Sequence, residues 1–246
     1  MYKGFKFFIF LLSLSMFSQN ETKNWYFGNK AAIKFENGRV INLDDSEMDA
    51  PSNSTSISDE NGNLLFYSDG ATVWNRNHEI MQFGAGLIGQ NTHFQSTIII
   101  PNPADKNKYY LFYTRSESLP SLAYNPGTYF SEIEFNNEYP NGVVTTKNFI
   151  LNRNAPSEKI TAVHHKDGKS FWLITLNAED ENSSSPKKIF NLFKIDETGL
   201  NTTPTEIIAN DVIENLGVMK FSPNGKKLAI SANTNNDSLK RVLIYD

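Results

Sequence analysis

The chain has 246 residues, of which 39% are hydrophobic, 13% aromatic and 20% charged. This composition is typical of a globular protein with a substantial core and excludes an intrinsically disordered chain. The formal net charge of −4 argues against a nucleic-acid-binding protein, because nucleic-acid-binding surfaces are usually basic.

Residues 1–19 are predicted to be a secretory signal peptide. Lys3 and Lys6 precede an apolar run from Phe7 to Phe17, and small or polar residues follow it. This order of charged, apolar and polar regions directs export, and the apolar run is short for spanning a bilayer. We therefore expect a secreted or cell-surface protein with no transmembrane segment after cleavage; an uncleaved anchor is the alternative.

The chain contains no cysteine. A lipoprotein anchor, disulfide bonds and cysteine-ligated metal sites are therefore excluded. The exported domain must owe its stability to side-chain packing and to the hydrogen bonds of β-ladders.

Six Asn-Gly or Asp-Gly pairs punctuate the rest of the chain, and such pairs favour tight β-hairpin turns. The pairs begin at Asn37, Asn61, Asp69, Asn141, Asp167 and Asn224. Most are flanked by short runs rich in β-branched and aromatic residues, which predict strands. Because no long stretch after the signal peptide has helical periodicity, the sequence predicts an all-β domain over residues 20–246.

The predicted strands fall into repeated units. Two short runs, at 31–35 and 39–43, come first. Four longer units then start near residues 54, 96, 160 and 217, and each opens on a strand of small and apolar residues. Four-stranded units with a spacing of about 40 to 65 residues are typical of a β-propeller. A repeated hairpin meander in a β-sandwich is the alternative.

Several stretches resemble a group of secreted Bacteroidetes proteins. They are "NWYFGNKAAIKF" from Asn24, "ISDENGNLLFYSDGATVWNRNHEIM" from Ile57, "GLIGQNTHFQSTIIIPNP" from Gly86, "KYYLFYT" from Lys108 and "FSPNGKKLA" from Phe221. In that group the corresponding region forms a WD-like β-propeller, and many members carry a C-terminal gliding-motility-associated or type IX secretion sorting domain. The resemblance implies the fold and an extracellular location, and it implies no defined activity.

The last unit reaches Asp246 after three predicted strands, which is short of a closed ring. We expect residues 20–246 to hold about three to four four-stranded antiparallel blades, truncated at the C-terminal end or forming an unclosed arc. Further domains would then belong to a longer protein. The two N-terminal runs would be outer strands whose inner partners come from a missing last blade.

Few residues suggest a metal site. His164 and His165 are adjacent in a predicted strand, so their side chains should point to opposite faces, which favours a structural role between blades. The oxygen-rich segments Asp45–Asp49 and Asp59–Asn63 could hold calcium. The first is better explained as a solvated segment and the second as a hairpin turn, so no cofactor is expected.

The segment "GAGLIG" from Gly84 matches the dinucleotide-binding fingerprint G-x-G-x-x-G. That fingerprint requires a preceding strand and a following helix. The sequence after Gly89 leads into a predicted strand, so we interpret the segment as the crossover between the first two units.

Three aromatic side chains, Trp74, Trp172 and Tyr110, could stack on sugars. In propeller strands such rings more often pack between blades, which we favour here.

We therefore predict a non-catalytic binding or adhesion module with a protein or glycan ligand at the propeller face. The alternatives are an exported propeller enzyme acting on glycans, as a hydrolase or lyase, and a structural spacer in a larger surface protein. Propellers usually bind ligands with the loops that enter their innermost strands. The candidate binding-face residues lie just before those strands: Asn53, Gln95, Lys159 and Asn215.

Overall fold

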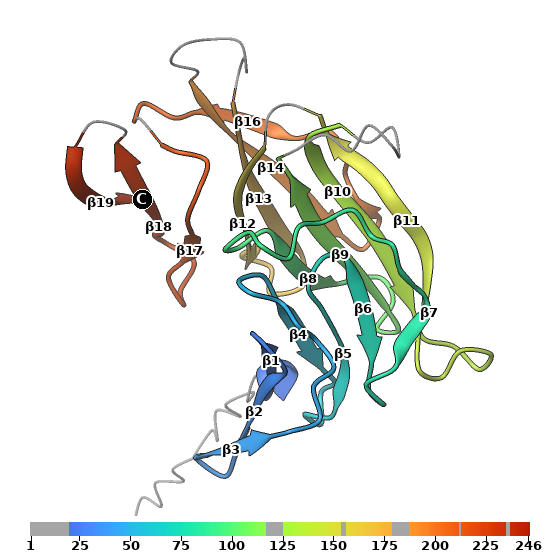
Figure 1. The fold of residues 1–246 in the computed structure, drawn as a ribbon. Helices are drawn as coiled ribbons and strands as arrows, with labels where there is room; N and C mark the ends of the chain where they lie inside the picture. The colour runs from blue at the N-terminus through green and yellow to red at the C-terminus, as the bar shows by residue number, and fades with distance from the viewer. Residues whose placement is uncertain (1–19, 117–124, 154–155, 179–186, 212, 235–236) are drawn as a thin grey trace, which may run out of the picture.

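A computed structural model of the chain describes residues 20–116, 125–153, 156–178, 187–211, 213–234 and 237–246. Its elements are strands β1–β19 and one short 3₁₀ helix, η1 (Asn20–Thr22) (Figure 1). Nearly all neighbouring strands pair antiparallel. The prediction of an all-β, antiparallel architecture is therefore confirmed. The predicted signal peptide, residues 1–19, lies outside the described residues.

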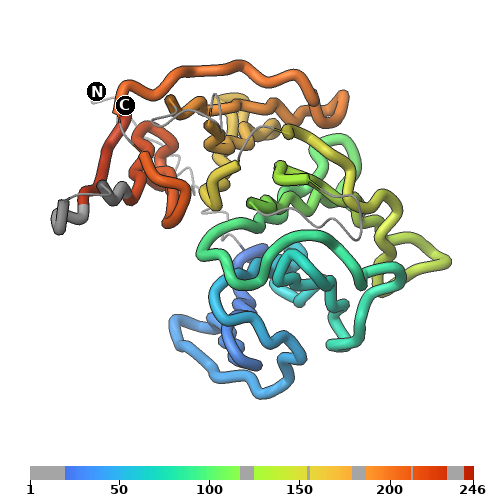
Figure 2. Tube along the Cα trace, turned by 45° about the horizontal axis from the view of Figure 1, so that its top comes forward, coloured from blue at the N-terminus to red at the C-terminus, as the bar shows by residue number. Residues whose placement is uncertain are grey.

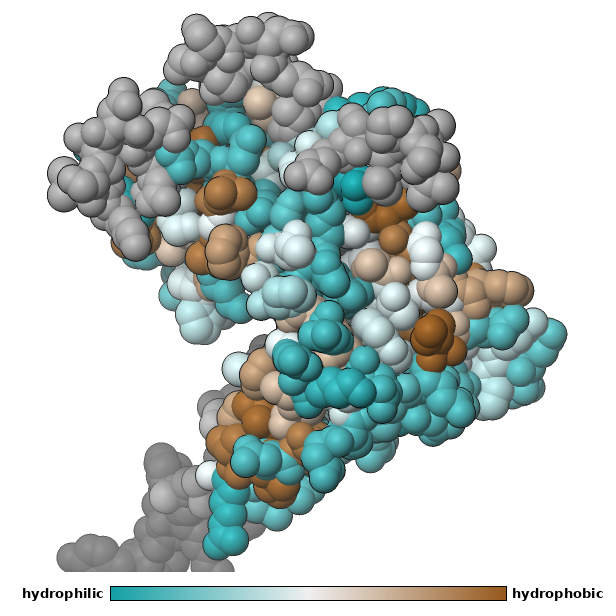
Figure 3. All heavy atoms as spheres, viewed as in Figure 1, coloured by the Kyte–Doolittle hydropathy of each residue, from teal (hydrophilic) through white to brown (hydrophobic). Residues whose placement is uncertain are grey.

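The first sheet has three strands in the order β1-β2-β3. Their bounds are β1 (Asn24–Phe27), β2 (Ala31–Glu36) and β3 (Arg39–Leu43). Alternation turns Tyr26 and Ala32 into the core, whereas Trp25 and Phe35 on the other face are 49% and 36% exposed. Figure 3 shows apolar atoms gathered over this sheet. The first sheet thus carries an exposed apolar face.

The second sheet has eight strands in the order β4-β5-β6-β7-β11-β10-β9-β8. Their bounds are β4 (Thr55–Ser58), β5 (Leu64–Ser68), β6 (Thr72–Asn75), β7 (Ile80–Ala85), β8 (Thr97–Pro101), β9 (Lys108–Arg115), β10 (Gly127–Glu134) and β11 (Val143–Asn152). Two four-stranded meanders meet where β7 and β11 pair in parallel at Gln82 and Val143. Because the edge strands β4 and β8 contact each other, this sheet is nearly closed.

The third sheet contains β12-β13-β14-β15, with β16 also paired to β14, and the fourth contains β17-β18-β19. The bounds of the third are β12 (Pro156–His164), β13 (Phe171–Ala178), β14 (Lys188–Asp196), β15 (Gly199–Leu200) and β16 (Thr205–Ile208). Those of the fourth are β17 (Met219–Phe221), β18 (Leu228–Thr234) and β19 (Asp237–Tyr245). The predicted unit starts near residues 54, 96, 160 and 217 lie in or next to β4, β8, β12 and β17.

All six predicted Asn-Gly and Asp-Gly turns are confirmed, because each glycine has a positive φ and lies between two paired strands. In the β2–β3 turn, Asn37 and Gly38 have φ values of 52° and 72°. Two consecutive positive φ values match the twist of a two-residue hairpin. Local turn chemistry therefore fixes these hairpins.

The first strands of the four units lie next to one another in chain order. β4 contacts β8, β8 contacts β12, and β12 contacts β17. Apolar clusters fill the spaces between neighbouring sheets; Tyr110 of β9, for example, packs with Ile160 of β12 and Phe193 of β14. The predicted packing of Tyr110 between units is thus confirmed. In Figures 1 and 2, β1–β3 and β17–β19 lie at the two ends of this arrangement.

A stack of three rings joins the first sheet to the second. The ring centroids of Tyr26 and Tyr67 are 4.4 Å apart, and those of Tyr67 and Trp74 are 5.5 Å apart. Met48 is fully buried beside them. The segment Asp45–Asp49 is therefore only partly solvated, since its acidic side chains are exposed while Ser46 and Met48 are buried.

The "GAGLIG" segment connects the first two units, as predicted. Gly84 and Ala85 end β7, and the chain continues to β8 without a helix. Side chains of β11 hold this connection: Lys147 Nζ donates to the Ala85 carbonyl at 2.6 Å, and Asn148 Nδ2 donates to the Gly86 carbonyl at 3.2 Å. Because the segment connects two strands, it provides no helix N-terminus that could bind a pyrophosphate.

Candidate functional site

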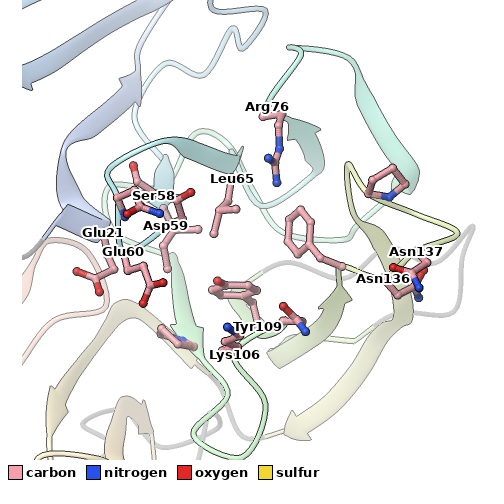
Figure 4. Close-up of a pocket in the computed structure, with 16 residues that line it drawn as sticks. Glu21, Ser58, Asp59, Glu60, Leu65, Arg76, Lys106, Tyr109, Asn136 and Asn137 are labelled. Atoms are coloured by element: carbon pink, nitrogen blue, oxygen red, sulfur yellow. Dashed lines mark hydrogen bonds between the residues drawn. The ribbon is translucent and has the colours of Figure 1, made fainter.

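A pocket of about 530 Å³ opens between the first two units of the eight-stranded sheet (Figure 4). It lies where the β4–β5, β6–β7, β8–β9 and β10–β11 connections come together. Its lining combines aromatic rings with acidic, basic and amide side chains. The polar and aromatic members are Glu21, Ser58, Asp59, Glu60, Asn61, Arg76, Lys106, Asn107, Tyr109, Phe135, Asn136 and Asn137.

Two aromatic rings form an apolar wall of the pocket. The centroids of Tyr109 and Phe135 are 5.9 Å apart at 84°, and Tyr109 packs edge-on against the fully buried Phe66 at 5.5 Å. Burial raises the pKa of Tyr109 to about 12, with the charges of Asp59 and Glu21 adding to the effect. The Tyr109 hydroxyl therefore stays protonated and can donate a hydrogen bond at physiological pH.

Arg76 follows β6 and extends into the pocket (Figure 4). The Asn75 side chain shapes this turn by accepting hydrogen bonds from the Asn77 and Glu79 amides at 2.8 and 3.3 Å. The guanidinium carbon lies 5.7 Å from the Phe135 ring centroid, which is within cation–π range. The ring thus orients an exposed guanidinium.

Asp59 supports the acidic side of the pocket through its own turn. Its carboxylate accepts hydrogen bonds from the Asn61 amide at 2.9 Å and from the Asn63 amide at 2.8 Å. Burial raises the pKa of Asp59, but hydrogen bonds from Asn63 and Asn61 and the charge of Arg76 outweigh it, so the pKa lies below its ordinary value. The prediction that Asp59–Asn63 is a hairpin turn is confirmed.

The amide side chains play two different roles. Asn136 stabilises the β10–β11 connection, since its Oδ1 accepts from the Glu138 and Tyr139 amides at 3.0 and 2.9 Å. Asn107 and Asn137 are exposed, and within the described part of the chain their side-chain amides make no hydrogen bond. These two amides can therefore hydrogen-bond a ligand.

The four predicted binding-face residues lie elsewhere, and two of them are buried. Asn53 is 1% exposed, and its side chain donates to the Asp69 carbonyl at 2.9 Å and to the Thr97 hydroxyl at 2.6 Å. Lys159 is fully buried and lies inside β12, not before it. Its ammonium donates to the carbonyls of Glu214, at 2.7 Å, and Leu216.

The other two candidates are accessible and also link units. Gln95 is partly buried, and its side-chain oxygen accepts a hydrogen bond of 2.8 Å from the Met219 amide. Asn215 is exposed, and its carbonyl accepts from the Ser157 hydroxyl at 2.8 Å. All four candidates thus belong to the junctions between first strands, and none lines the pocket. Their role in ligand binding stays a prediction.

The paired histidines contact side chains of their own hairpin, and their predicted role between units stays a prediction. His164 is exposed, and its ring packs at 4.4 Å against Phe171 of the same hairpin. His165 Nδ1 lies 2.9 Å from an oxygen of Asp167 in the adjoining turn. Among the described residues, no group of three or more His, Asp or Glu side chains could hold a metal ion. Calcium binding stays untested by this.

No sequence motif marks the pocket. Asp59, Arg76, Tyr109 and Phe135 come from four separate connections or strand ends, and only the packing of two meanders brings them together. The one local signal for the pocket was that polar residues occupy turns next to strand ends with aromatic residues.

Within the described ranges, no helix has the length and apolar character needed to cross a membrane.

Comparison of the chain with known protein families and with curated proteins gives no match. Its function therefore has to be inferred from its own residues.

Proposed function

We propose that residues 20–246 form blades of a β-propeller that acts outside the cell as a non-catalytic binding module for glycans. Three features support the propeller: repeated antiparallel meanders, first strands that contact each other in chain order, and apolar clusters between neighbouring units. The parallel joint between β7 and β11 is the main departure from separate four-stranded blades. The signal-like residues 1–19 and the resemblance to secreted Bacteroidetes propellers support export.

The observation that carries the glycan proposal is the pairing of an aromatic wall with unsatisfied polar side chains in one open pocket. Tyr109 and Phe135 offer apolar ring surface, while Arg76, Asn107 and Asn137 offer hydrogen-bonding groups. Sugars present apolar C–H faces bordered by hydroxyl groups, so they can satisfy both kinds of surface at once. Pockets that bind small molecules combine apolar walls with a few fixed polar groups in this way.

The state of Asp59 argues against one catalytic role in the pocket, that of a general acid. A general acid needs a carboxyl group that is protonated near the working pH. The turn hydrogen bonds lower the pKa of Asp59 and so keep it ionised. This carboxylate holds the hairpin and is unsuited to donating a proton.

A glycan array probed with the purified protein tests the proposal. We expect retained glycans whose binding weakens at least fivefold when Asn107 and Asn137 are both replaced by alanine, because each loses a hydrogen bond. Asn42→Ala, an exposed substitution on β3 outside the pocket, is the matched control and should leave retention unchanged. Retention of no glycan, or equal retention by the double variant, would contradict the proposal.

A further inference from the structure

We infer that the pocket is specific for glycans that carry an anionic group, a carboxylate or a sulfate, and that Arg76 binds this group. The inference rests on the proposed glycan binding and adds the chemical class of the ligand. It follows from the availability of Arg76 and from the distribution of charge around the pocket.

The guanidinium of Arg76 lies beside an aromatic ring but has no acidic or carbonyl partner among the described residues. It packs over Phe135 at 5.7 Å, and among the described residues no hydrogen bond or ion pair to it is formed. A guanidinium offers five N–H donors in a planar fork that matches two oxygens of a carboxylate or sulfate. The contact with Phe135 favours a position of the guanidinium in which these donors face the pocket.

Asp59 is an acidic side chain of the same pocket that could pair with Arg76, and it already accepts hydrogen bonds in its own turn. The charge of Arg76 contributes to the lowered pKa of Asp59, so the two groups attract each other. However, both carboxylate oxygens accept hydrogen bonds within the turn, from Asn61 and Asn63. Among the described residues no hydrogen bond or ion pair joins Asp59 to Arg76, so a ligand anion can accept from the donors of Arg76.

The pocket is lined by both acidic and basic side chains. In Figure 4, Glu21 and Glu60 lie together on one side, whereas Arg76 lies apart from them across the pocket. Lys106, from the β8–β9 connection, supplies a second exposed cation. A sugar with one anionic substituent fits this pattern, since its hydroxyl groups can donate to the carboxylates while its anionic group accepts from Arg76.

The test compares each retained glycan with its neutral counterpart. Carboxylated glycans are measured before and after reduction of the carboxylate to an alcohol, and sulfated glycans before and after desulfation, by titration calorimetry. We expect the intact anionic form to bind about tenfold more tightly, a preference that weakens with added salt. If only reduction of the carboxylate weakens binding, the charged group is a carboxylate. If only desulfation weakens binding, it is a sulfate.

Substitution of Arg76 assigns the preference to its side chain. Arg76→Gln should reduce the preference to less than threefold, and Arg76→Lys should retain only part of it because lysine keeps the charge but lacks the fork. Arg39→Gln, at the exposed first residue of β3 and outside the pocket, is the matched control and should retain the full preference. Arg76 is exposed, so thermal unfolding should show the same midpoint for all three variants.

The outcomes separate this inference from the proposed function. Equal affinity for anionic and neutral forms, unchanged in Arg76→Gln, would overturn the inference while leaving glycan binding intact. A preference for anionic glycans that survives in Arg76→Gln would also overturn it. Binding of no glycan on the array would overturn both.

Discussion

The side-chain amide of Asn53 donates a hydrogen bond of 2.6 Å to the hydroxyl of Thr97 and so joins the start of β4 to β8. The same side chain accepts from the Ser96 amide at 3.2 Å and donates to the Asp69 carbonyl at 2.9 Å. Two units of the chain are thus connected by one buried amide.

We expect Asn53→Ala to lower the free energy of unfolding by about 2–3 kcal/mol, because it leaves buried polar groups without partners. Urea unfolding measures this, with Asn77→Ala, an exposed turn residue, as the control. Combining Asn53→Ala with Thr97→Val should cost less than the sum of the single changes, since both remove the same hydrogen bond. A loss below about 0.5 kcal/mol in Asn53→Ala would show that the hydrogen bonds of Asn53 contribute little to the free energy of unfolding.

A second prediction concerns Gly70, which lies beside the same junction. Its φ is +87°, and a Cβ there would lie 2.5 Å from Thr97 Oγ1 and 3.2 Å from Asn53 Nδ2. Gly38 also has a positive φ, +72°, but a Cβ there would have no atom within 4 Å. Gly38→Ala should therefore cost about 1 kcal/mol for backbone strain alone, and Gly70→Ala about 3 kcal/mol because it adds a clash. Equal losses in urea unfolding would refute the proposed clash.

A third prediction follows from the buried ammonium of Lys159. Burial lowers its pKa to about 8 from the ordinary 10.5. Between these values the unfolded chain holds a proton that the folded chain has released, so stability rises with pH. The full effect corresponds to about 3 kcal/mol. Burial raises the pKa of Tyr109 to about 12, so that tyrosine acts in the opposite direction only above pH 10.

Urea unfolding at pH 7.5 and 9.5 tests this expectation. The wild-type protein should be more stable at pH 9.5, and Lys159→Met should show a smaller rise. Some rise should remain, because burial also lowers the pKa of Lys188. Lys169→Met, in an exposed turn, should behave like wild type. A rise of the same size in Lys159→Met would assign it to other groups.

A fourth prediction concerns Asn148 of β11. Its Oδ1 accepts from the Ile88 amide at 3.2 Å and from the Tyr113 hydroxyl at 2.7 Å, and its φ is +57°. Asn148→Ala should cost about 2 kcal/mol and speed hydrogen exchange at the Ile88 amide. Asn148→Gly loses the same bonds without the backbone strain, so it should be less destabilising than alanine. Unchanged exchange at Ile88 in both variants would contradict this role.

The sequence predicted features that depend on neighbours along the chain. The Asn-Gly and Asp-Gly pairs specify their turns locally, so the hairpins around Gly62 and Gly168 could be read directly. The fourth strand of the first unit, β7, was not recognised. Its sequence, IMQFGA, ends in Gly84 and Ala85, which are uncommon in strands, so the expected strand pattern is weak.

The parts that were not predicted depend on contacts between distant segments. Asn53 and Lys159 have polar side chains typical of exposed positions, yet they are buried because backbone carbonyls of other segments accept their hydrogen bonds. The pocket was missed for a related reason: Arg76 and Phe135 are far apart in sequence and meet only when two meanders pack. No pattern within one segment encodes such a meeting.

The way in which β11 holds the "GAGLIG" segment also bears on how units of this kind can be exchanged during evolution. This border combines main-chain pairing of β7 with β11, which accepts almost any side chain, and hydrogen bonds that require Lys147 and Asn148. A duplicated or recombined unit would keep these side-chain hydrogen bonds only if it brought both residues with it. The two meanders of the eight-stranded sheet should therefore be inherited as one piece, with crossover points on either side of them and not between them.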